Sequence, residues 1–311
     1  MREIKTGMAA VSKSRSLNRL RCREAFCAYV FIAPMVIGLM VLSIYAFGEN
    51  IYLSFTKSGA FGSPKWIGIK NYQDLLTDSY FWICLKNTLI YAFVGTPLVV
   101  IFSTLVAALL NTKIRGRTAY RTLVFIPAVT MPAAIGLLWR WLLNSQYGIV
   151  NHLLGFLGIA GPSWLSDPNI VKWSILLVLV WSMSSYYVII MLAGLQGIAP
   201  IYYDAAKVDG ANRRQTFFHV TVPLLTPIIF FTAVMAMIGI LQIFDFIYLM
   251  LQRTSAAYQY AMSLVSYFYD LAFSQNVRGY ASAVTIVLCA IIIVITAIQM
   301  IAQKYWVHYD D

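Results

Sequence analysis

The sequence predicts an all-α integral membrane protein with six transmembrane helices and both termini in the cytoplasm. Three observations support this fold class: 60% of the 311 residues are hydrophobic, only 11% are charged, and the mean hydropathy is +0.73. A chain of this composition cannot present a charged surface to water on every side. Segments that cross a bilayer must pair their backbone polar groups internally, and these apolar runs are too long for the strands of a barrel.

Six apolar runs have the length of about twenty residues that a helix needs to cross about 30 Å of hydrocarbon. They cover residues 26–48, 88–110, 122–140, 173–195, 223–251 and 279–302. We therefore expect a basic N-terminal segment at 1–25, followed by a single transmembrane domain at 26–311. The first run is longer than the apolar part of a signal peptide and no cleavage pattern follows it, so we expect it to remain as a helix.

The distribution of Lys and Arg predicts the orientation, because basic segments resist translocation. With both termini inside, the inner segments carry 15 Lys and Arg in 71 residues, whereas the outer segments carry 7 in 98. The inner segments are 1–25, 111–121, 196–221 and 303–311, and the outer segments are 49–87, 141–172 and 252–278. The net charge of +11 is thus mainly a topology signal. No nucleic-acid partner is expected, because no aromatic residues are interleaved with the basic N-terminus.

Catalytic, metal and nucleotide sites find little support in the chain. Its four cysteines and three histidines are scattered over different predicted compartments, without a CxxC pair. There is no GxxxxGK[ST] loop for ATP, and the glycines of GFLGIAG at 155–161 lack the strand, turn and helix of a nucleotide-binding turn. No Ser/His/Asp cluster is visible either. We expect no enzyme activity, no metal and no cofactor in this chain, which leaves transport, signalling or scaffolding.

The predicted cytoplasmic loop at 196–222 separates these three classes. Pro200 is suited to the first position of a helix, and Gly210 is suited to the left-handed residue that ends one. The resulting helix has about two turns, which is too short to be stable alone, so we expect another surface to hold it. A second helix is expected at 212–222, before Pro223 opens the next membrane span. An ordinary helical connection is the alternative.

The stretch DAAKVDGANRRQTFFHVTVPLLTP resembles the EAA loop of the inner-membrane permease subunits of ABC importers. The family pattern is Glu-Ala-Ala, three residues, Gly, nine residues, then Ile-x-Leu-Pro. The matching positions are Asp204, Ala205, Ala206, Gly210, Val220, Val222 and Pro223. The DGA sequence that begins at Asp209 is typical of the carbohydrate-importing branch. Other stretches that agree are NTLIYAF from Asn87, GRTAYRTLVFIPAVTMPAAIGLLWRWLLNSQYGIVN from Gly116, LAGLQGIAP from Leu192, QIFDFIYLM from Gln242 and GYASAVTIV from Gly279.

The resemblance implies a multi-pass permease subunit of the cell membrane. Its implied partners are a second, homologous permease, a cytoplasmic ATPase dimer that binds ATP and magnesium, and an extracytoplasmic solute-binding protein. The short helix of the loop is the implied ATPase-coupling element, with the residues Asp204, Ala205, Ala206, Asp209, Gly210 and Pro223. The small alanines would let the partner surface approach closely. One departure is that Asp204 replaces the family's Glu, which shortens the acid by one methylene.

This resemblance implies that the solute is a sugar or glycerol-3-phosphate, since permeases for both kinds of solute share the motifs. Asp245 is the acid inside a predicted span, where ionisable groups are costly and therefore point to function, and Gln242 lies one turn earlier. Tyr187 and Phe244 could stack on a sugar ring. For all four residues, a role in packing within the protein is the alternative to contact with the solute. No Lys or Arg lies in the middle of a span, which favours a neutral sugar.

Two other classes of protein remain as alternatives. An ion-coupled secondary carrier is expected to show internal repeats and several buried ionisable residues, and the chain has one intramembrane acid and no obvious repeat. A membrane scaffold or receptor gives no reason for the spacing in the loop. Co-purification with an ATPase separates an importer subunit from both.

Overall fold

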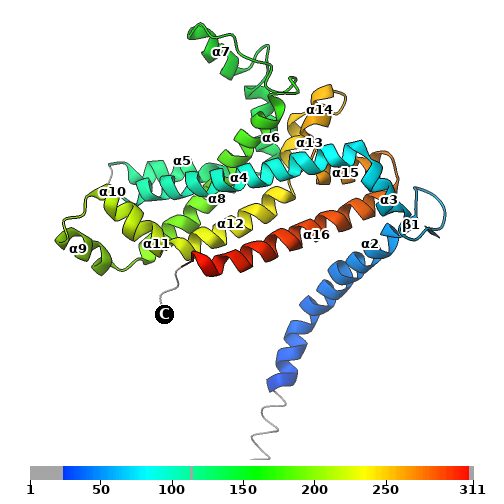
Figure 1. Cartoon of the computed structure of the whole chain (residues 1–311), viewed down its shortest axis with the longest axis horizontal. Coiled ribbons are helices and arrows are strands. Elements are labelled where there is room, and N and C mark those ends of the chain that lie inside the picture. The colour runs from blue at the N-terminus through cyan, green and yellow to red at the C-terminus, as the bar shows by residue number, and fades with distance from the viewer. Residues whose placement is uncertain (1–23, 113–114, 308–311) are drawn as a thin grey trace, which may run out of the picture.

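The protein is a bundle of long helices with shorter helices gathered at its two ends (Figure 1). The computed structural model describes residues 24–112 and 115–307. Most of the predicted basic segment at 1–25 lies outside these residues. Four described helices are long and apolar enough to cross a membrane, or six if each of two bent helix pairs is counted as one span. The prediction of a helical membrane protein is confirmed, and the count of six depends on how the bent pairs are treated.

The core of the bundle consists of α4 (Ser79–Asn111), α8 (Val171–Gly197), α12 (Thr226–Leu241) and α16 (Arg278–Ala302). Helix α4 packs along both α8 and α12, and α16 packs against α12 (Figure 1). Gly95 of α4 permits one of these close approaches, because a Cβ atom there would lie 3.1 Å from the side chain of Leu176. Their buried faces are rich in Val, Ile, Leu and Ala, as expected for helices buried against one another.

The first helix stands apart from this bundle. It runs from Glu24 to Ser54 as one continuous element, which includes the π-helical η1 (Met40–Tyr45) and α2 (Ala46–Ser54). None of its most apolar window is buried against the rest of the chain. The C-terminal part of this helix, α2, contacts α16, and its N-terminal part extends away from the bundle (Figure 1). A long apolar helix left bare in this way must be covered by lipid or by another chain.

The predicted span at 122–140 is not one straight helix. It consists of α5 (Arg117–Val129) and α6 (Pro132–Leu142), which meet at an angle of 104°. The break has a local cause, because Met131 precedes Pro132 and a residue before proline is pushed out of the helical region; its ψ is 130°. Helix α6 then packs closely against α13 (Asp245–Met250), since a Cβ atom at Gly136 would lie 3.0 Å from the side chain of Leu249.

The predicted span at 223–251 is not one continuous helix either. A helix from Arg213 to Leu224 bends by 66° into α12, so the bend follows Pro223 instead of preceding it. Helix α12 ends at Leu241, and an irregular segment separates it from α13. This second break has no glycine or proline. The carbonyl oxygen of Ile243, freed from the helix, accepts a hydrogen bond of 2.6 Å from the hydroxyl of Ser263.

The end of the bundle opposite α9 (Pro200–Val208) is built from short elements. These are β1 (Thr56–Lys57), β2 (Lys65–Trp66), α3 (Lys70–Thr77), α14 (Ala256–Ala261), α15 (Leu264–Tyr269) and η3 (Asp270–Ser274). The two strands pair antiparallel, with Thr56 opposite Trp66. Helix α7 (Ile149–Phe156) and the 3₁₀ turn η4 (Gln303–Tyr305) are two further short elements. Between α9 and α12 lie α10 (Arg213–Thr216), η2 (Phe217–Thr221) and α11 (Val222–Leu224).

Buried side chains of α4 fix the segment between α14 and α15. The amide of Asn87 donates to the carbonyl oxygens of Tyr260 and Met262 at 2.9 and 3.0 Å. The hydroxyl of Tyr91 donates to the carbonyl of Ala261, and the hydroxyl of Thr88 accepts from the backbone of Leu264. The NTLIYAF stretch therefore serves to hold a distant loop in place.

Candidate functional site

Helix α9 begins and ends as its sequence predicts. Pro200 occupies the first helical position, where its missing N–H costs no hydrogen bond. Gly210 has a φ of 75°, in the left-handed region. The backbone N–H of Ala211 donates to the carbonyl of Ala206, and that of Gly210 donates to the carbonyl of Lys207. These two hydrogen bonds form a complete Schellman motif, which ends the helix at a defined residue.

The next helix starts at once with a capping box. Asn212 accepts from the backbone N–H of Gln215 at 2.9 Å, and the side chain of Gln215 accepts from the backbone N–H of Asn212 at 2.9 Å. The helix continues through α10 (Arg213–Thr216), η2 (Phe217–Thr221) and α11 (Val222–Leu224). A helix stop followed directly by a helix start fixes the angle between α9 and the chain that leads to α12.

The two alanines of the predicted coupling motif differ in exposure, although both line the cleft between α9 and the helix that follows it. Ala206 is only 7% exposed. Ala205 lies on the exposed face of α9 with Ile201 and Val208, which are 71% and 88% exposed. The positions 201, 205 and 208 are spaced i, i+4 and i+7, so they share one side of the helix. The exposed face of this short helix thus carries two branched apolar residues, Ile201 and Val208.

Asp204 lies next to this exposed face. Its carboxylate forms an ion pair of 2.8 Å with the ammonium group of Lys207, one turn later. Both side chains are largely exposed, so the pair contributes little to stability. The acid is therefore free to exchange Lys207 for a cation of another molecule.

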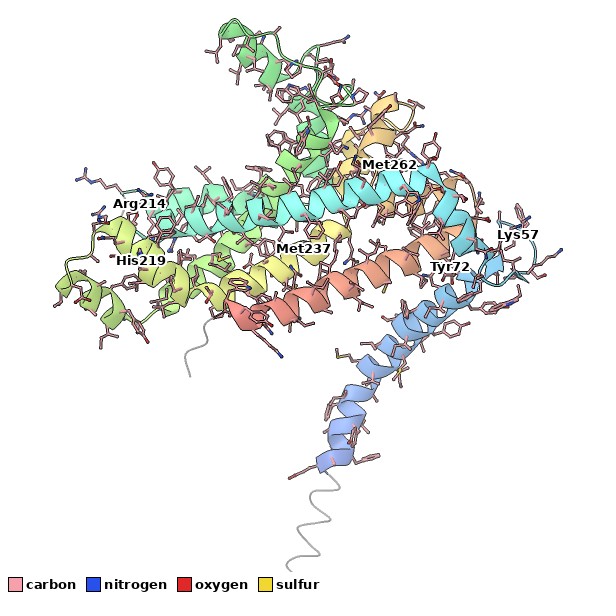
Figure 2. The ribbon with its side chains drawn as sticks, viewed as in Figure 1. Lys57, Tyr72, Arg214, His219, Met237 and Met262 are labelled. Carbon is pink, nitrogen blue, oxygen red and sulfur yellow. The ribbon has the colours of Figure 1, made fainter. Side chains whose placement is uncertain are left out.

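A cleft of about 530 Å³ separates α9 from the helix that follows it. Its walls include Ala205, Asp209, Gln215, His219 and Pro223. Nδ1 of His219 lies 3.1 Å from the carbonyl oxygen of Gln215 and donates a hydrogen bond to it in the tautomer that carries the proton on Nδ1. Figure 2 shows Arg214 and His219 at this end of the molecule, far from Lys57 and Tyr72 at the opposite end. Of the predicted coupling residues, Ala205, Ala206, Asp209 and Pro223 line this cleft, whereas Asp204 and Gly210 do not.

The α9 end is packed onto the bundle by its own small core. Leu225 is buried with Met191, Leu195 and Leu110, which come from α8 and α4. Gly194 of α8 allows this contact, because a Cβ atom there would lie 2.9 Å from the side chain of Leu225. The junction between α11 and α12 is therefore held to both long helices by packed side chains.

The four predicted solute-path residues do not form one cluster. Gln242 and Asp245 are exposed, in the break between α12 and α13 and at the first position of α13. Asp245 is consequently not in the middle of a continuous spanning helix, and the break removes the helical i−3 relationship between the two residues. Tyr187 is buried on α8, with its ring 5.4 Å from that of Tyr186. It belongs to the hydrophobic core of this chain.

Phe244 belongs to an aromatic cluster that the sequence did not reveal. Its ring centroid lies 5.0 Å from that of Tyr248 and 4.9 Å from that of Tyr269, and Phe273 continues the cluster. The guanidinium of Arg253 lies 5.8 Å from the centroids of both tyrosines and pairs with Asp270. Sequence separation concealed this arrangement, since Arg253 and Asp270 are on different elements of a segment expected to be loop.

Within the described residues, no three His, Cys, Asp or Glu side chains are grouped as ligands for a metal ion. The capping box at Asn212 was a further feature missed in the sequence. Its signal was present, as an Asn followed three residues later by Gln.

Comparison with known proteins gives a consistent result. The family described as binding-protein-dependent transport system inner membrane component matches residues 85–306. A probable ABC transporter permease protein of Bacillus subtilis, YesP, is 36% identical over 308 residues and covers 98% of each chain. The lactose transport system permease protein LacF of Rhizobium radiobacter is 32% identical over 281 residues, covering 89% of this chain and 93% of its own.

A solved structure has the same fold. It is a chain of a bacterial alginate ABC transporter in complex with a periplasmic protein that carries an alginate pentasaccharide. The TM-score is 0.78 at 22% identity, and the match covers 91% of this chain and 95% of the other.

Proposed function

Because the chain belongs to the family of binding-protein-dependent transport system inner membrane components, we propose that it is the transmembrane permease subunit of an ATP-driven sugar importer. Family membership confirms the resemblance drawn from the loop at 204–223. The solute class rests on relatives named as permeases for lactose, for arabinooligosaccharides and for trehalose and maltose. The helical, apolar architecture agrees with a subunit that lies in the membrane.

The exposed face of α9 is the observation that carries the coupling role. Ile201, Ala205 and Val208 form an apolar strip on a helix whose ends are fixed by a Schellman motif and a capping box. We assign this strip as the contact with a cytoplasmic ATPase dimer, which binds ATP and magnesium itself. Asp204 adds an acid that can exchange Lys207 for a cation of that partner.

The motion of the ATPase would reach the solute path by packing. Helix α9 is joined to α8 on one side and to the helix at 213–224 on the other. At the end of that helix, the side chain of Leu225 packs against both α8 and α4. Through such a rigid unit, motion of the ATPase would shift the permease between its two conformations, as expected for a two-state transporter.

A second permease and a solute-binding protein complete the proposed assembly. The bare first helix, Glu24–Ser54, supports a neighbouring permease, because its apolar surface has no cover within the described part of the chain. The solved relative contains a periplasmic protein bound to its oligosaccharide, which supports a binding protein on the face opposite α9. The Lys and Arg distribution supports cytoplasmic termini and a cytoplasmic α9.

The solute path is proposed to pass the break between α12 and α13. Gln242 and Asp245 offer exposed hydrogen-bonding groups there, and the aromatic ring of Phe244 lies between them in the sequence. Amide and carboxylate groups beside an aromatic ring suit the hydroxyls and apolar face of a sugar. No observation favours glycerol-3-phosphate over a sugar, and none favours an ion-coupled carrier.

Co-purification of the tagged, full-length chain from its native membranes tests this proposal. An ATPase and a second permease should be recovered with it, and replacing Val208 by Asp should remove the ATPase while the second permease remains. A matched control is Val277→Asp, an exposed valine at the opposite end of the bundle. Recovery of the chain without an ATPase from cells that take up the sugar would overturn the proposal. Competition by unlabelled sugars and by glycerol-3-phosphate against a labelled sugar then identifies the solute.

A further inference from the structure

A small polar pocket, which we call the Arg140 pocket, lies beside α13 and close to the proposed solute path. Its volume is about 120 Å³, and it is formed by the end of α6, the residues just after α6, the residues before α8 and the end of α13 with the loop that follows. Met250, the last residue of α13, lines it, so the pocket lies about 8 Å along this helix from Asp245. Its polar side chains are Arg140, Asn144, Ser145, Ser166, Gln252 and Ser255.

The Arg140 pocket lies at membrane depth and not at the level of the lipid headgroups. The ring centroid of Trp139 is 5.4 Å from that of Trp181 on α8. Trp181 lies about 15 Å along α8 from the first residue of that helix, Val171. Arg140 follows Trp139 directly, and an ionisable side chain at this depth is costly and points to function. The expectation of a neutral sugar depended on a straight span at 122–140 that ends at Arg140, and the bend between α5 and α6 removes that basis.

The guanidinium of Arg140 has no acidic partner within residues 24–112 and 115–307. Its side chain is half-buried, and the two ion pairs found in those residues do not include it. Asp167 follows Ser166 of the pocket, but its carboxylate accepts a hydrogen bond of 2.8 Å from the backbone N–H of Asn169. Arg140 is in the last turn of α6, where the helix dipole favours a cation but supplies only about half a charge. The described part of the chain therefore supplies this cation with no full counter-charge.

The other polar side chains of the pocket offer mainly hydrogen-bond donors. Oδ1 of Asn144 accepts from the backbone N–H groups of Gln146 and Tyr147 at 2.9 and 3.2 Å. These two bonds orient the amide, so the group that Asn144 can offer to a ligand is its Nδ2 donor. The hydroxyls of Ser145 and Ser166 can donate as well. A guanidinium, an amide donor and hydroxyls around one small volume suit an anion.

We propose that the Arg140 pocket binds the carboxylate of an acidic sugar, so that the solute is a saccharide that contains a uronic acid. This inference rests on the proposed importer function and specifies its solute. A carboxylate is planar and carries one charge, which matches a single guanidinium through two parallel hydrogen bonds. A phosphate ester carries close to two charges, of which one cation balances only half. The pocket has the volume of roughly four water molecules of about 30 Å³ each, so it holds the carboxylate while the sugar ring stays in the path beside α13.

Saturation-transfer NMR on the full-length chain, purified in detergent with the subunits that accompany it, tests the pocket. The probes are digalacturonate and its dimethyl ester, which has the same rings but no charge. We expect digalacturonate to bind more tightly than the ester. Arg140→Gln should weaken digalacturonate binding about tenfold, the scale of a hydrogen bond to a charged group, and leave the ester unchanged. Arg140→Lys keeps the charge without the paired hydrogen bonds and should recover part of the affinity.

A second variant, Asn144→Asp, keeps Oδ1 for the turn at Gln146 and replaces the donor by a carboxylate. This acid should pair with Arg140 and abolish the preference for digalacturonate while the chain still folds. Arg278→Gln is the matched control, because Arg278 is exposed at the first position of α16, and it should bind both probes like the parent.

Equal binding of the two probes by the parent, or an unchanged preference in Arg140→Gln and Asn144→Asp, overturns the pocket. Acetate that binds as tightly as digalacturonate assigns the pocket to a free anion and overturns the acidic sugar. These results leave the importer function standing, because that function is tested by recovery of the ATPase in the same preparation.

Discussion

The carboxylate of Asp78 accepts a hydrogen bond of 2.7 Å from the hydroxyl of Tyr280, which joins the start of α4 to α16. The hydroxyl of Tyr267 on α15 donates to the same oxygen, and the backbone N–H of Tyr80 donates to the other. Burial by itself would raise the pKa of Asp78, but these hydrogen bonds stabilise the anion and hold the pKa below its ordinary value of 3.8. One carboxylate thus connects three helices.

This clamp predicts a loss of stability in acid. A carboxyl group whose pKa is lowered by folding stabilises the protein above its unfolded pKa, and the contribution disappears as pH falls through the folded value. Between about pH 5 and pH 3, the thermal midpoint of the parent in detergent should therefore fall more steeply than that of Asp78→Asn. Asp74→Asn, on the neighbouring α3, serves as the control. Equal slopes for the parent and Asp78→Asn would contradict the clamp.

Gly279 should tolerate no side chain. A Cβ atom at this position would lie 2.0 Å from the carbonyl oxygen of Thr56, and its own N–H donates to the carbonyl of Ser58 at 3.2 Å. Both contacts are with backbone, so neither can rotate away. We expect Gly279→Ala to destabilise the protein by about 1–3 kcal/mol, as overpacking does. Gly155→Ala, where a Cβ meets nothing within 4 Å, is the matched control in a detergent unfolding assay. Similar midpoints for both variants would rule out the close approach.

Asn87 should be needed for the segment between α14 and α15. Its buried amide serves two carbonyl oxygens, and Asn87→Leu would leave both without a donor at a cost of about 1–3 kcal/mol for each. Hydrogen exchange should rise at residues 257–264 while α8 remains protected. Exposed Asn169→Leu should change neither. Uniform loosening of the whole bundle in Asn87→Leu would argue against this local role.

Local signals in the sequence predicted much of the fold, but they did not mark every break in the helices. Pro200 and Gly210 bracket α9 because both act on their own backbone. The break at Met131 also had a local sign, in the proline that follows it. The break after Leu241 had none, since it is held by Ser263 from a later element. Hydropathy therefore merged α12 and α13 and placed Asp245 inside a span.

The site shows the same division between local and distant causes. The motif at 204–223 identified the family, because it depends only on residue types and their spacing along the sequence. Which of the two alanines is buried depends on the tertiary packing of α9, and this cannot be read from Ala-Ala alone. Tyr187 and Phe244 both looked suited to a sugar, yet tertiary packing buries one in the core and places the other in an aromatic cluster.

Gly210 should be required for the angle between α9 and α10. At its φ of 75°, a side chain costs about 1–2 kcal/mol although a Cβ atom would meet nothing within 4 Å. Gly210→Ala should therefore loosen the loop through backbone strain alone and reduce sugar uptake. Gly210→Asn should be milder, because Asn tolerates the left-handed region. Protease cleavage at 207–213 measures the loosening of the loop, and a transport assay measures sugar uptake. Equal cleavage and equal uptake in Gly210→Ala and Gly210→Asn would contradict the strain.

Ala205 and Ala206 provide a matched pair that separates docking from folding. Ala206 is only 7% exposed, beside the cleft between α9 and the helix that follows it, so Ala206→Leu should overpack this junction and lower the thermal midpoint of the isolated subunit, at a cost of about 1–3 kcal/mol. Ala205 lies on the exposed strip, so Ala205→Leu should leave that midpoint unchanged but block close approach of the ATPase and reduce uptake. The unfolding midpoint, ATPase co-purification and uptake are measured for both. Normal uptake in Ala205→Leu would remove the exposed strip from the coupling role, whereas an unchanged midpoint in Ala206→Leu would show that Ala206 is not closely packed.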